Sequence, residues 1–294
     1  MQRPAPAWKR RDAREAPTLF YEPKFVSAPD RAEIVRWLST LHPLWEDRYS
    51  AHRPPPAGQP QRRLLRPVYW LGNWQFACLD YYRPPSGITD RCVRAEPFAP
   101  VLARLVAEIE KKAKKRYSGR DLPERWHLNT CLVNLYGSHL EPDGRRTDVA
   151  RVGEHKDFEP GPVASISLGE RALFQFVASR SPGQRDSVVA QQWLDDGSLQ
   201  LFGGDRWKKQ LFHRVQRVDR RAGAHFDVRP ADFETRRVNF TFRYVPGEHV
   251  VPFLALSRDA QADVRGYVET LALNSPFFAA QLARAPHPLT RGNP

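Results

Sequence analysis

The sequence has few cysteines and no long apolar run. Its 294 residues include three cysteines, Cys78, Cys92 and Cys131, with no C-x-x-C spacing. An odd, widely spaced set supports neither a disulfide framework nor a thiolate zinc site, and it favours a reducing compartment. No segment approaches the roughly 18 apolar residues of a membrane span, and the charged first residues lack the roughly 7–15 apolar residues of a signal peptide. We therefore expect a soluble cytoplasmic protein that has no disulfide-linked partner and binds no membrane.

Acidic residues are scarce relative to basic ones. The chain has 46 Lys and Arg against 33 Asp and Glu, which gives a formal net charge of +13. Nearly all of the excess lies in three segments, residues 1–17, 51–67 and 111–125. These N-terminal basic clusters predict a nucleic-acid partner, DNA or RNA. Solubility, or favourable charge at a helix C-terminus, explains the same composition without a partner.

Most predicted strands lie in the second half of the chain. After Trp126, short runs rich in Val, Leu, Ile, Thr and Phe are separated by Gly, Pro and Asp clusters. The runs are HLNTCLVNLY, VASISL, ALFQF, SLQLFG, QLFHRV and RRVNFTFRYV. Several strands at this spacing, without helices between them, predict an antiparallel sandwich or jelly roll. We expect a mostly β fold with flanking helices, of the α+β class.

The chain divides into four predicted segments. Two helices with an apolar face are expected early, one capped by Ser27 and one from about Pro97 to Lys115. Helical character is expected again from Asp259 to Arg284, with a break near Pro276. Its apolar positions are Val264, Val268, Leu271 and Leu273. The segments are a basic disordered tail (1–17), an N-terminal helical part (18–125), a β core (126–246) and a C-terminal helical extension (247–294).

One pair of side chains has the spacing of metal ligands. His155 and Asp157 are two residues apart, so on a strand or its extended edge both project to the same side. With His213 from a distant strand they would form the two-histidine, one-carboxylate set that binds non-haem Fe(II). An H-x-D pair alone is weak support for a metal site, and His225-Phe-Asp227 repeats the spacing.

A second motif is a strand with a strongly polar face. Alternation puts Val238, Phe240 and Phe242 toward the core and the residues between them on the other face. Two arginines on one strand face are costly to bury without anions, and a small dicarboxylate would satisfy them. A polar outer face on an edge strand is the plainer reading. The polar-face residues are Arg237, Asn239, Thr241 and Arg243, with Asn134 and Tyr136 sharing a face on another strand.

Taken in order, these motifs resemble the AlkB family of Fe(II)- and 2-oxoglutarate-dependent dioxygenases. The matching sequence runs from about Cys131 to Arg243, and the final R-x-N-x-T-x-R is its most specific part. The other elements are N-x-Y (134–136), H-x-D (155–157), S-x-S-L-G (165–169), F-Q-F (174–176) and the distal His213. The order also argues against His225 as the first ligand, because the arginine strand would then precede any distal histidine.

The resemblance implies a double-stranded β-helix and a set of site residues. Iron would be held by His155, Asp157 and His213, which are also the catalytic residues. 2-Oxoglutarate would be held by Asn134, Tyr136, Arg237, Asn239 and Arg243. In the family pattern, Arg237 with Tyr136 grips the distal carboxylate, and Arg243 with Asn134 lies nearer the iron-chelating end. The co-substrates are 2-oxoglutarate and O2, and the implied products are succinate, carbon dioxide and formaldehyde.

Substrate contacts are implied for the segment before the barrel, which forms a nucleotide-recognition lid in the family. Tyr69, Trp70 and Trp74 are the candidates for stacking on a base, although core packing accounts for such aromatics more simply. Glu159 sits where the family often carries an acidic residue beside the substrate base; a solvated acid at a strand end is the alternative. A mobile proline-rich loop would contact phosphate through Arg53, Arg62, Arg63 and Arg66.

The predicted function is oxidative demethylation of N-alkylated bases in DNA, of the 1-methyladenine and 3-methylcytosine type. Two alternatives remain at this point. One has the same iron chemistry acting on RNA, a protein side chain or a small molecule. The other is a non-enzymatic nucleic-acid-binding protein with a vestigial barrel. Two departures from the family pattern, the long polar segment at 138–154 and the roughly fifty residues after Arg243, leave the substrate side open.

Overall fold

The computed structural model describes residues 19–79, 92–149, 151–179, 188–219, 225–228 and 232–284, with backbone only for 216–219. The predicted tail at 1–17 lies outside the described residues, as do the last ten residues of the predicted extension. All three cysteines are buried, and none of them forms a disulfide bond within the described residues. Among the described helices, none has the length and apolar character needed to cross a bilayer.

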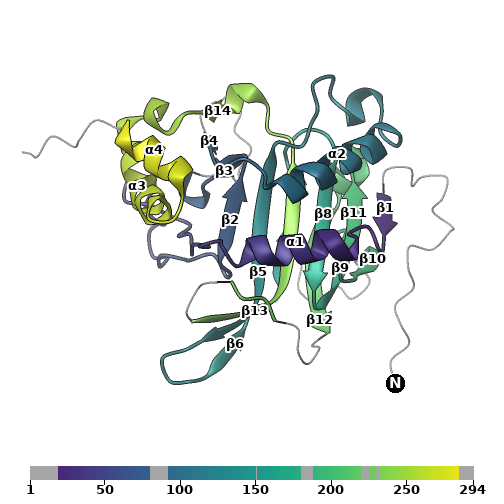
Figure 1. The fold of residues 1–294 in the computed structure, drawn as a ribbon, viewed down its shortest axis with the longest axis horizontal. Coiled ribbons are helices and arrows are strands. Elements are labelled where there is room, and N and C mark those ends of the chain that lie inside the picture. Colours follow the sequence, from purple (N-terminus) through teal and green to yellow (C-terminus); the bar gives the residue numbers. More distant parts are fainter. Residues whose placement is uncertain are drawn as a thin grey trace, which may run out of the picture.

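Two antiparallel sheets form the centre of the molecule (Figure 1). The large sheet has the order β1-β11-β8-β13-β5-β2, with β6 paired to β5, and the small sheet has the order β10-β9-β12-β7. The chain passes repeatedly between the sheets, which makes the jelly roll a double-stranded β-helix. The large-sheet strands are β1 (Leu19–Glu22), β2 (Val68–Leu71), β5 (Thr130–Leu140), β6 (Arg146–Asp148), β8 (Val163–Gly169), β11 (Ser198–Phe202) and β13 (Phe233–Arg243). The small-sheet strands are β7 (Val152–His155), β9 (Arg171–Val177), β10 (Val188–Leu194) and β12 (Phe212–Asp219).

All six predicted strand runs are strands, so the mostly β expectation is confirmed. Strands β1, β6, β7 and β10 were not predicted. A further small sheet joins β14 to β4 and β3. Its strands are β3 (Asn73–Gln75), β4 (Cys92–Arg94) and β14 (Val250–Val251), and the short helical turns are η2 (Ala77–Leu79), η3 (Gly119–Asp121), η5 (Arg206–Gln210), η6 (Gly247–His249) and η7 (Phe253–Ala255).

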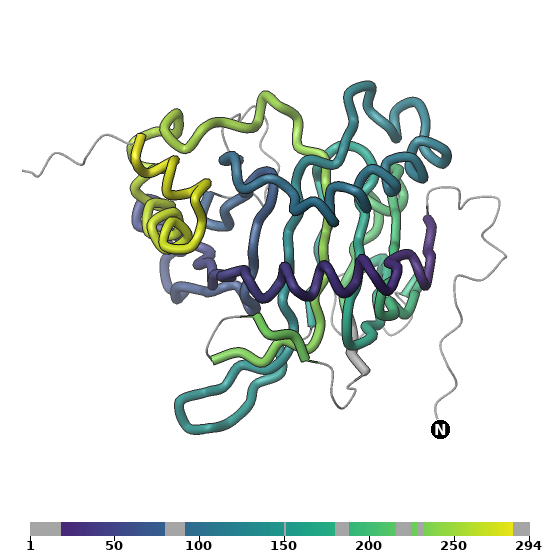
Figure 2. Tube along the Cα trace, viewed as in Figure 1, coloured from purple at the N-terminus to yellow at the C-terminus, as the bar shows by residue number. Residues whose placement is uncertain are grey.

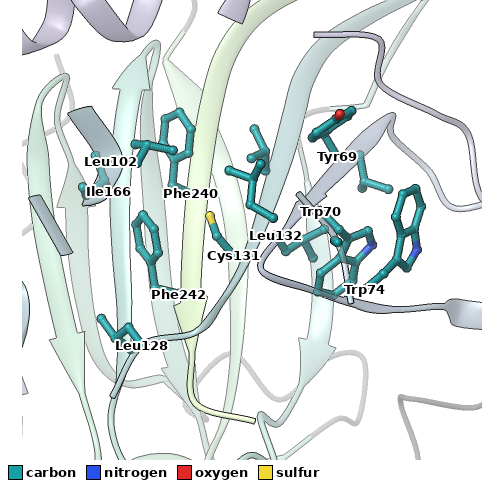
Figure 3. Packing of buried hydrophobic residues seen from close by; sticks show 14 of the residues in the cluster. Tyr69, Trp70, Trp74, Leu102, Leu128, Cys131, Leu132, Ile166, Phe240 and Phe242 are labelled. Atoms are coloured by element: carbon teal, nitrogen blue, oxygen red, sulfur yellow. The ribbon is translucent and has the colours of Figure 1, made fainter. Parts of the chain in front are cut away.

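Two helices, α1 (Ala28–Leu38) and α2 (Pro100–Lys114), cover the outer face of the large sheet (Figure 1). Helix α1 begins as predicted, because the Ser27 side chain accepts a hydrogen bond from the Asp30 amide. Against this layer pack Val238, Phe240 and Phe242, which are fully buried, with Leu102 and Ile166 close by (Figure 3). The predicted alternation of β13 is therefore correct, and its polar residues face the small sheet.

The N-terminal part is built into the β core rather than set apart from it. Strand β2 pairs with β5, and β1 pairs with β11, so both extend the large sheet at its edges. Two indoles of this region, Trp70 and Trp74, donate from Nε1 to Oε1 of Glu46 at 2.8 and 3.0 Å. Strands from both sides of the expected boundary near residue 125 therefore belong to one sheet.

The C-terminal extension packs on this edge of the core as helices α3 (Arg258–Ala272) and α4 (Pro276–Ala283) (Figure 2). Its predicted apolar positions are buried except Leu273, which follows the end of α3 and is 81% exposed. Phe278 lies edge-on to Trp74 with ring centroids 5.9 Å apart. The Tyr267 hydroxyl accepts a hydrogen bond from the Asp47 amide at 2.8 Å. The extension thus supports the segment that leads into β2.

A backbone irregularity sets which arginine of β13 faces inward. The register against β5 shifts between Thr235 and Arg237, so Arg236 is an extra residue on β13. Arg236 then points away and pairs with Glu170 at 3.0 Å, while Arg237 faces the interior. Opposite this bulge, Gly169 has φ +87°, and a Cβ there would lie 2.3 Å from the Arg236 carbonyl oxygen. The glycine of the S-x-S-L-G motif is therefore required by close backbone approach.

Candidate metal and co-substrate site

A cavity of about 1400 Å³ lies between the two sheets. Its walls come from β5, β8 and β13 on one side and from β7, β9 and β12 on the other. The structure brings all eight predicted iron and co-substrate residues to this one cavity. They are Asn134, Tyr136, His155, Asp157, His213, Arg237, Asn239 and Arg243.

The two histidines come from neighbouring strands of the small sheet. His155 ends β7 and lies directly opposite His213 on β12, with ring centroids 4.1 Å apart. Asp157 follows β7 by two residues, and its Oδ2 is 3.4 Å from Nε2 of His213. Across the described ranges, no set of three or more His, Cys, Asp or Glu side chains has the geometry to hold a metal ion as it stands. An ion bound here would require these three side chains to draw together.

Both imidazoles are oriented by their surroundings. Nδ1 of His155 is 2.8 Å from the Gly153 carbonyl oxygen, an arrangement that puts the proton on Nδ1 and leaves Nε2 free to bind a metal. The His213 ring is stacked on Phe174 at 5.5 Å and lies 5.2 Å from Phe202. The F-Q-F motif therefore packs against the distal histidine and keeps its surroundings apolar.

The protonation states suit a divalent cation. Burial lowers the pKa of His213 to about 3, and burial likewise lowers the pKa of His155, so both rings are neutral near pH 7. Burial alone would raise the pKa of Asp157, but the adjacent Arg243 guanidinium holds it well below its usual range. Asp157 Oδ2 and His213 Nδ1 are buried and form no hydrogen bond within the described part of the chain. Two neutral imidazoles and one ionised carboxylate are the donor set that non-haem Fe(II) prefers.

Arg243 contacts the carboxylate candidates rather than Asn134. Its Nε and Nη2 lie 2.9 and 2.8 Å from Asp157 Oδ1, and its Nε lies 3.6 Å from a Glu159 oxygen. The register explains the difference, because Asn134 pairs with Asn239, and Arg243 lies four residues further along β13, about 13 Å away. Without a co-substrate, Arg243 and Asn134 therefore do not contact each other, and their placement at the iron-chelating end of 2-oxoglutarate stays a prediction.

Arg237 is a buried cation that forms no ion pair with a carboxylate among the described residues. Its side chain is 1% exposed, and Nη2 donates to the Ser167 hydroxyl at 3.1 Å. Nε and Nη1 have no hydrogen-bond partner among the described residues. The guanidinium lies 4.8 Å from the ring centre of Tyr136, which is its cross-strand neighbour. Because an uncompensated buried charge is costly, this arrangement fits a bound carboxylate.

Asn239 lies between these two arginines on the same face of β13. Its Nδ2 donates to the Ser165 hydroxyl at 2.7 Å and is 3.2 Å from the Ser167 hydroxyl. Both serines come from β8, the neighbouring strand, and Asn239 is directly opposite Ser167. The S-x-S motif therefore fixes the amide of Asn239 and one nitrogen of Arg237 at the floor of the cavity.

Two residues of the cavity were not predicted for it. Nε of Arg66 donates to Oδ1 of Asn134 at 2.7 Å, although the sequence placed Arg66 on a phosphate-binding loop. Lys208, in the π-helical turn η5, is buried and donates to the carbonyl oxygens of Glu159 and Gly161, the latter at 2.7 Å. Neither carries a local sequence signal. Only the packing of distant segments brings them to the site.

The predicted substrate residues divide into two groups. Glu159 lines the cavity, and its Oε1 accepts a hydrogen bond from Gln75 at 3.0 Å. Trp70 and Trp74 are 1% and 0% exposed and lie in the core, as does Tyr69, whose hydroxyl donates to Glu96 at 2.6 Å (Figure 3). None of these three aromatics lines the cavity. The structure thus corrects their assignment as stacking residues. Strand β2 pairs with β5 and helix α4 packs against Trp74, so these side chains are buried in the core.

The basic clusters contribute unequally to the cavity. Residues 44–68, here called the basic loop, supply Arg48, Arg62, Arg63 and Arg66 to its lining, whereas Arg53 does not reach it. Of residues 111–125, only Arg120 and Asp121 line it. The loop is held in place: the Arg48 amide donates to the Arg62 carbonyl, and Ser50 donates to Asp263 of α3 at 2.6 Å. The mobility expected of residues 51–67 stays a prediction. The alternative pair His225 and Asp227 is exposed and does not line the cavity.

The model of the 2OG-Fe(II) oxygenase superfamily matches residues 18–243. The chain belongs to this superfamily. Its cofactor and co-substrates are therefore Fe(II), 2-oxoglutarate and O2. The donor set and the buried Arg237 described above are consistent with both ligands. No curated protein matches the chain.

Several solved structures resemble the described fold. OsALKBH1 is 22% identical, with 78% of this chain and 98% of that chain covered and a TM-score of 0.47. A Pseudomonas putida prolyl-4-hydroxylase is 12% identical, with 80% and 97% covered and a TM-score of 0.37. SnoN, an α-ketoglutarate-dependent epimerase from nogalamycin biosynthesis, is 13% identical, with 77% and 78% covered and a TM-score of 0.40.

Proposed function

We propose that this oxygenase oxidatively demethylates N-alkylated bases in DNA, of the 1-methyladenine or 3-methylcytosine type, and releases formaldehyde and succinate. One observation carries the proposal: a single cavity combines the two-histidine, one-carboxylate group and the arginine strand with a rim of exposed cations. The rim includes Arg62, Arg63, Arg120 and Lys209. A cationic rim suits a phosphodiester strand, and a recessed centre suits a base turned out of its stack.

The site residues have separate tasks in this proposal. His155, Asp157 and His213 hold Fe(II), which together with 2-oxoglutarate and O2 supplies the oxidation of the methyl carbon. Arg237 and Tyr136 hold one carboxylate of 2-oxoglutarate. Phe174 and Phe202 keep water from the buried face of His213.

Glu159 faces the same cavity as these ligands and is fixed by Gln75 and Arg243. An ionised carboxylate at this position suits a cationic methylated ring or an exocyclic amine. Glu159→Gln is therefore expected to reduce turnover of 1-methyladenine and 3-methylcytosine while leaving uncoupled 2-oxoglutarate decarboxylation intact. Equal loss of both activities would argue against contact with the base.

The test is a panel of methylated oligonucleotides incubated with the protein, Fe(II) and 2-oxoglutarate. Formaldehyde should appear only when all components are present, and the methylated oligonucleotide should raise succinate formation above its uncoupled level. Arg62→Gln with Arg63→Gln should weaken binding of the oligonucleotide and reduce its dependence on salt by about two phosphate contacts. If succinate forms but none of the single- or double-stranded methylated DNAs releases formaldehyde, DNA demethylation is excluded.

A second candidate has the same cofactors but a substrate other than a DNA base: RNA, a protein side chain or a small molecule. The burial of Tyr69, Trp70 and Trp74 favours it, because the predicted base-stacking aromatics are taken up by the core. Methylated RNA, peptides and small amines in the same assay separate the two candidates. A non-enzymatic role would require that no 2-oxoglutarate is decarboxylated with any of these substrates.

A further inference from the structure

Arg66 reaches the cavity from outside the barrel. It lies two residues before the edge strand β2, on the second limb of the basic loop. This limb is paired to the first limb through Leu44 and Val68. Its Nε donates to Oδ1 of Asn134 at 2.7 Å, and its guanidinium carbon lies 5.3 Å from the ring centre of Tyr136. Both neighbours belong to the N-x-Y motif of β5. Arg66 therefore stands over two residues that the proposed function gives to 2-oxoglutarate.

The charges around Tyr136 are unbalanced. Arg237 also lies over this ring, at 4.8 Å, so the two guanidinium carbons are no more than about 10 Å apart. Neither arginine forms an ion pair with a carboxylate in the described part of the chain. The cavity's buried carboxylates, Asp157 and Glu159, are both directed to Arg243. Two arginines that line one cavity beside the same tyrosine, and that form no ion pair there, are suited to hold one anion together.

We propose that Arg66 is a second cation for the carboxylate that Arg237 and Tyr136 hold, and that this contact ties co-substrate binding to the basic loop. The inference rests on the proposed placement of 2-oxoglutarate at Arg237. It extends that placement, because Arg66 lies outside the R-x-N-x-T-x-R strand. Since Arg62 and Arg63 precede Arg66 on the same limb, a bound dicarboxylate also fixes the loop that lines the mouth of the cavity.

The binding test uses the full chain with Mn(II) in place of Fe(II), so that no turnover occurs. Calorimetric titration should show 2-oxoglutarate binding about 10- to 100-fold more weakly to Arg66→Gln than to the parent protein. Arg66→Lys should recover part of this loss. Arg53→Gln is the matched control, because Arg53 lies on the same loop outside the cavity. This variant should bind 2-oxoglutarate as tightly as the parent protein.

Oxalate separates a direct contact from a general disturbance of the site. It can chelate the metal but cannot extend to a second carboxylate position, so Arg66→Gln should leave oxalate affinity unchanged. Hydrogen exchange in residues 44–68 should slow when 2-oxoglutarate binds the parent protein, and it should not slow in Arg66→Gln.

Each contrary result has a distinct meaning. Normal 2-oxoglutarate affinity in Arg66→Gln, alongside loss in Arg237→Gln, would overturn the role of Arg66 and leave the proposed function intact. Equal weakening of oxalate, or an effect confined to nucleic-acid binding, would overturn it as well. Failure of the parent protein to bind 2-oxoglutarate would instead reject the proposed site as a whole.

Discussion

Nε and Nη2 of Arg243 lie 2.9 and 2.8 Å from the same oxygen, Oδ1 of Asp157. This contact joins the last residue of the arginine strand to the carboxylate of the H-x-D motif, 86 residues earlier. It leaves Oδ2 facing His213. The pair therefore orients the carboxylate, and a change to either residue is expected to affect both the metal and the co-substrate.

Asp157→Asn tests the metal assignment with little change of shape. The amide oxygen can still accept from Arg243, but the anionic charge is lost. Mn(II) affinity should fall more than about 100-fold, and turnover should be abolished, because only neutral donors remain. Mn(II) titration by electron paramagnetic resonance checks the first expectation. Binding of unmodified DNA should stay within about twofold, since the basic rim is untouched; activity retained in this variant would remove Asp157 from the metal site.

Arg237→Met tests the buried, unpaired cation. Without a ligand, the guanidinium is desolvated and lacks a counter-ion, so an apolar side chain of similar length should raise the free energy of unfolding by about 1–2 kcal/mol. The same change should eliminate measurable 2-oxoglutarate binding. Urea unfolding and calorimetry measure the two effects. A variant that is less stable than the parent protein, yet binds 2-oxoglutarate normally, would show that Arg237 is structural.

Lys208→Met tests the support of the loop that carries Asp157 and Glu159. The change leaves the carbonyl oxygens of Glu159 and Gly161 without their donor, which should cost about 2–3 kcal/mol of unfolding free energy. Mn(II) affinity should fall about 10-fold as the loop loosens. Lys209→Met is the matched control. Its ammonium is exposed and pairs with Asp205 at 2.8 Å, so the cost should stay below about 0.5 kcal/mol. Equal effects of Lys208→Met and Lys209→Met would contradict a specific role of Lys208 in holding this loop.

Glu46 gives a pH dependence of stability that is independent of the cavity. Burial raises its pKa from 4.5 to about 7, although Trp70, Trp74 and the Ala77 amide all donate to it. Because the folded state holds the proton more tightly than the unfolded state, this contribution is complete below pH 4.5 and is lost as pH rises through 7. The loss amounts to about 3 kcal/mol.

Glu46→Gln should remove that pH dependence. The amide stays neutral, but it cannot accept from both Trp indoles and the Ala77 amide, which costs about 1 kcal/mol at every pH. Urea unfolding at pH 4 and pH 8 should therefore show the variant less stable than the parent protein at pH 4 and more stable at pH 8. An unfolding difference that is the same at both pH values would mean that Glu46 does not titrate in this range.

The strands and the faces of β13 could be predicted from the sequence because their signal is local. A period of two residues puts Val238 and Phe240 on one side and Arg237 and Asn239 on the other, whatever the rest of the chain does. The order of the motifs likewise predicts that His155 and Asp157 meet a histidine from a later strand. The structure agrees, with His155 directly opposite His213.

Contacts between distant segments could not be predicted in this way. The sequence favoured core packing for the aromatics near β2 but left a lid open. The pairing of β2 with β5 and the cover by α4 bury Trp70 and Trp74. Leu273 fits the helical spacing of its neighbours, yet it lies beyond the end of α3 and is exposed.

The sequence by itself determined the barrel strands, the two-histidine, one-carboxylate set and the polar face of β13, since each depends on residue type and short spacing. Only the tertiary structure decided which charges meet. It directs Arg243 to Asp157, brings Arg66 over Asn134 and Tyr136, and places Lys208 under the loop that carries Glu159. These contacts form between residues that are far apart in the sequence. Which charges come close enough to interact therefore depends on how the segments pack, and not on local residue spacing.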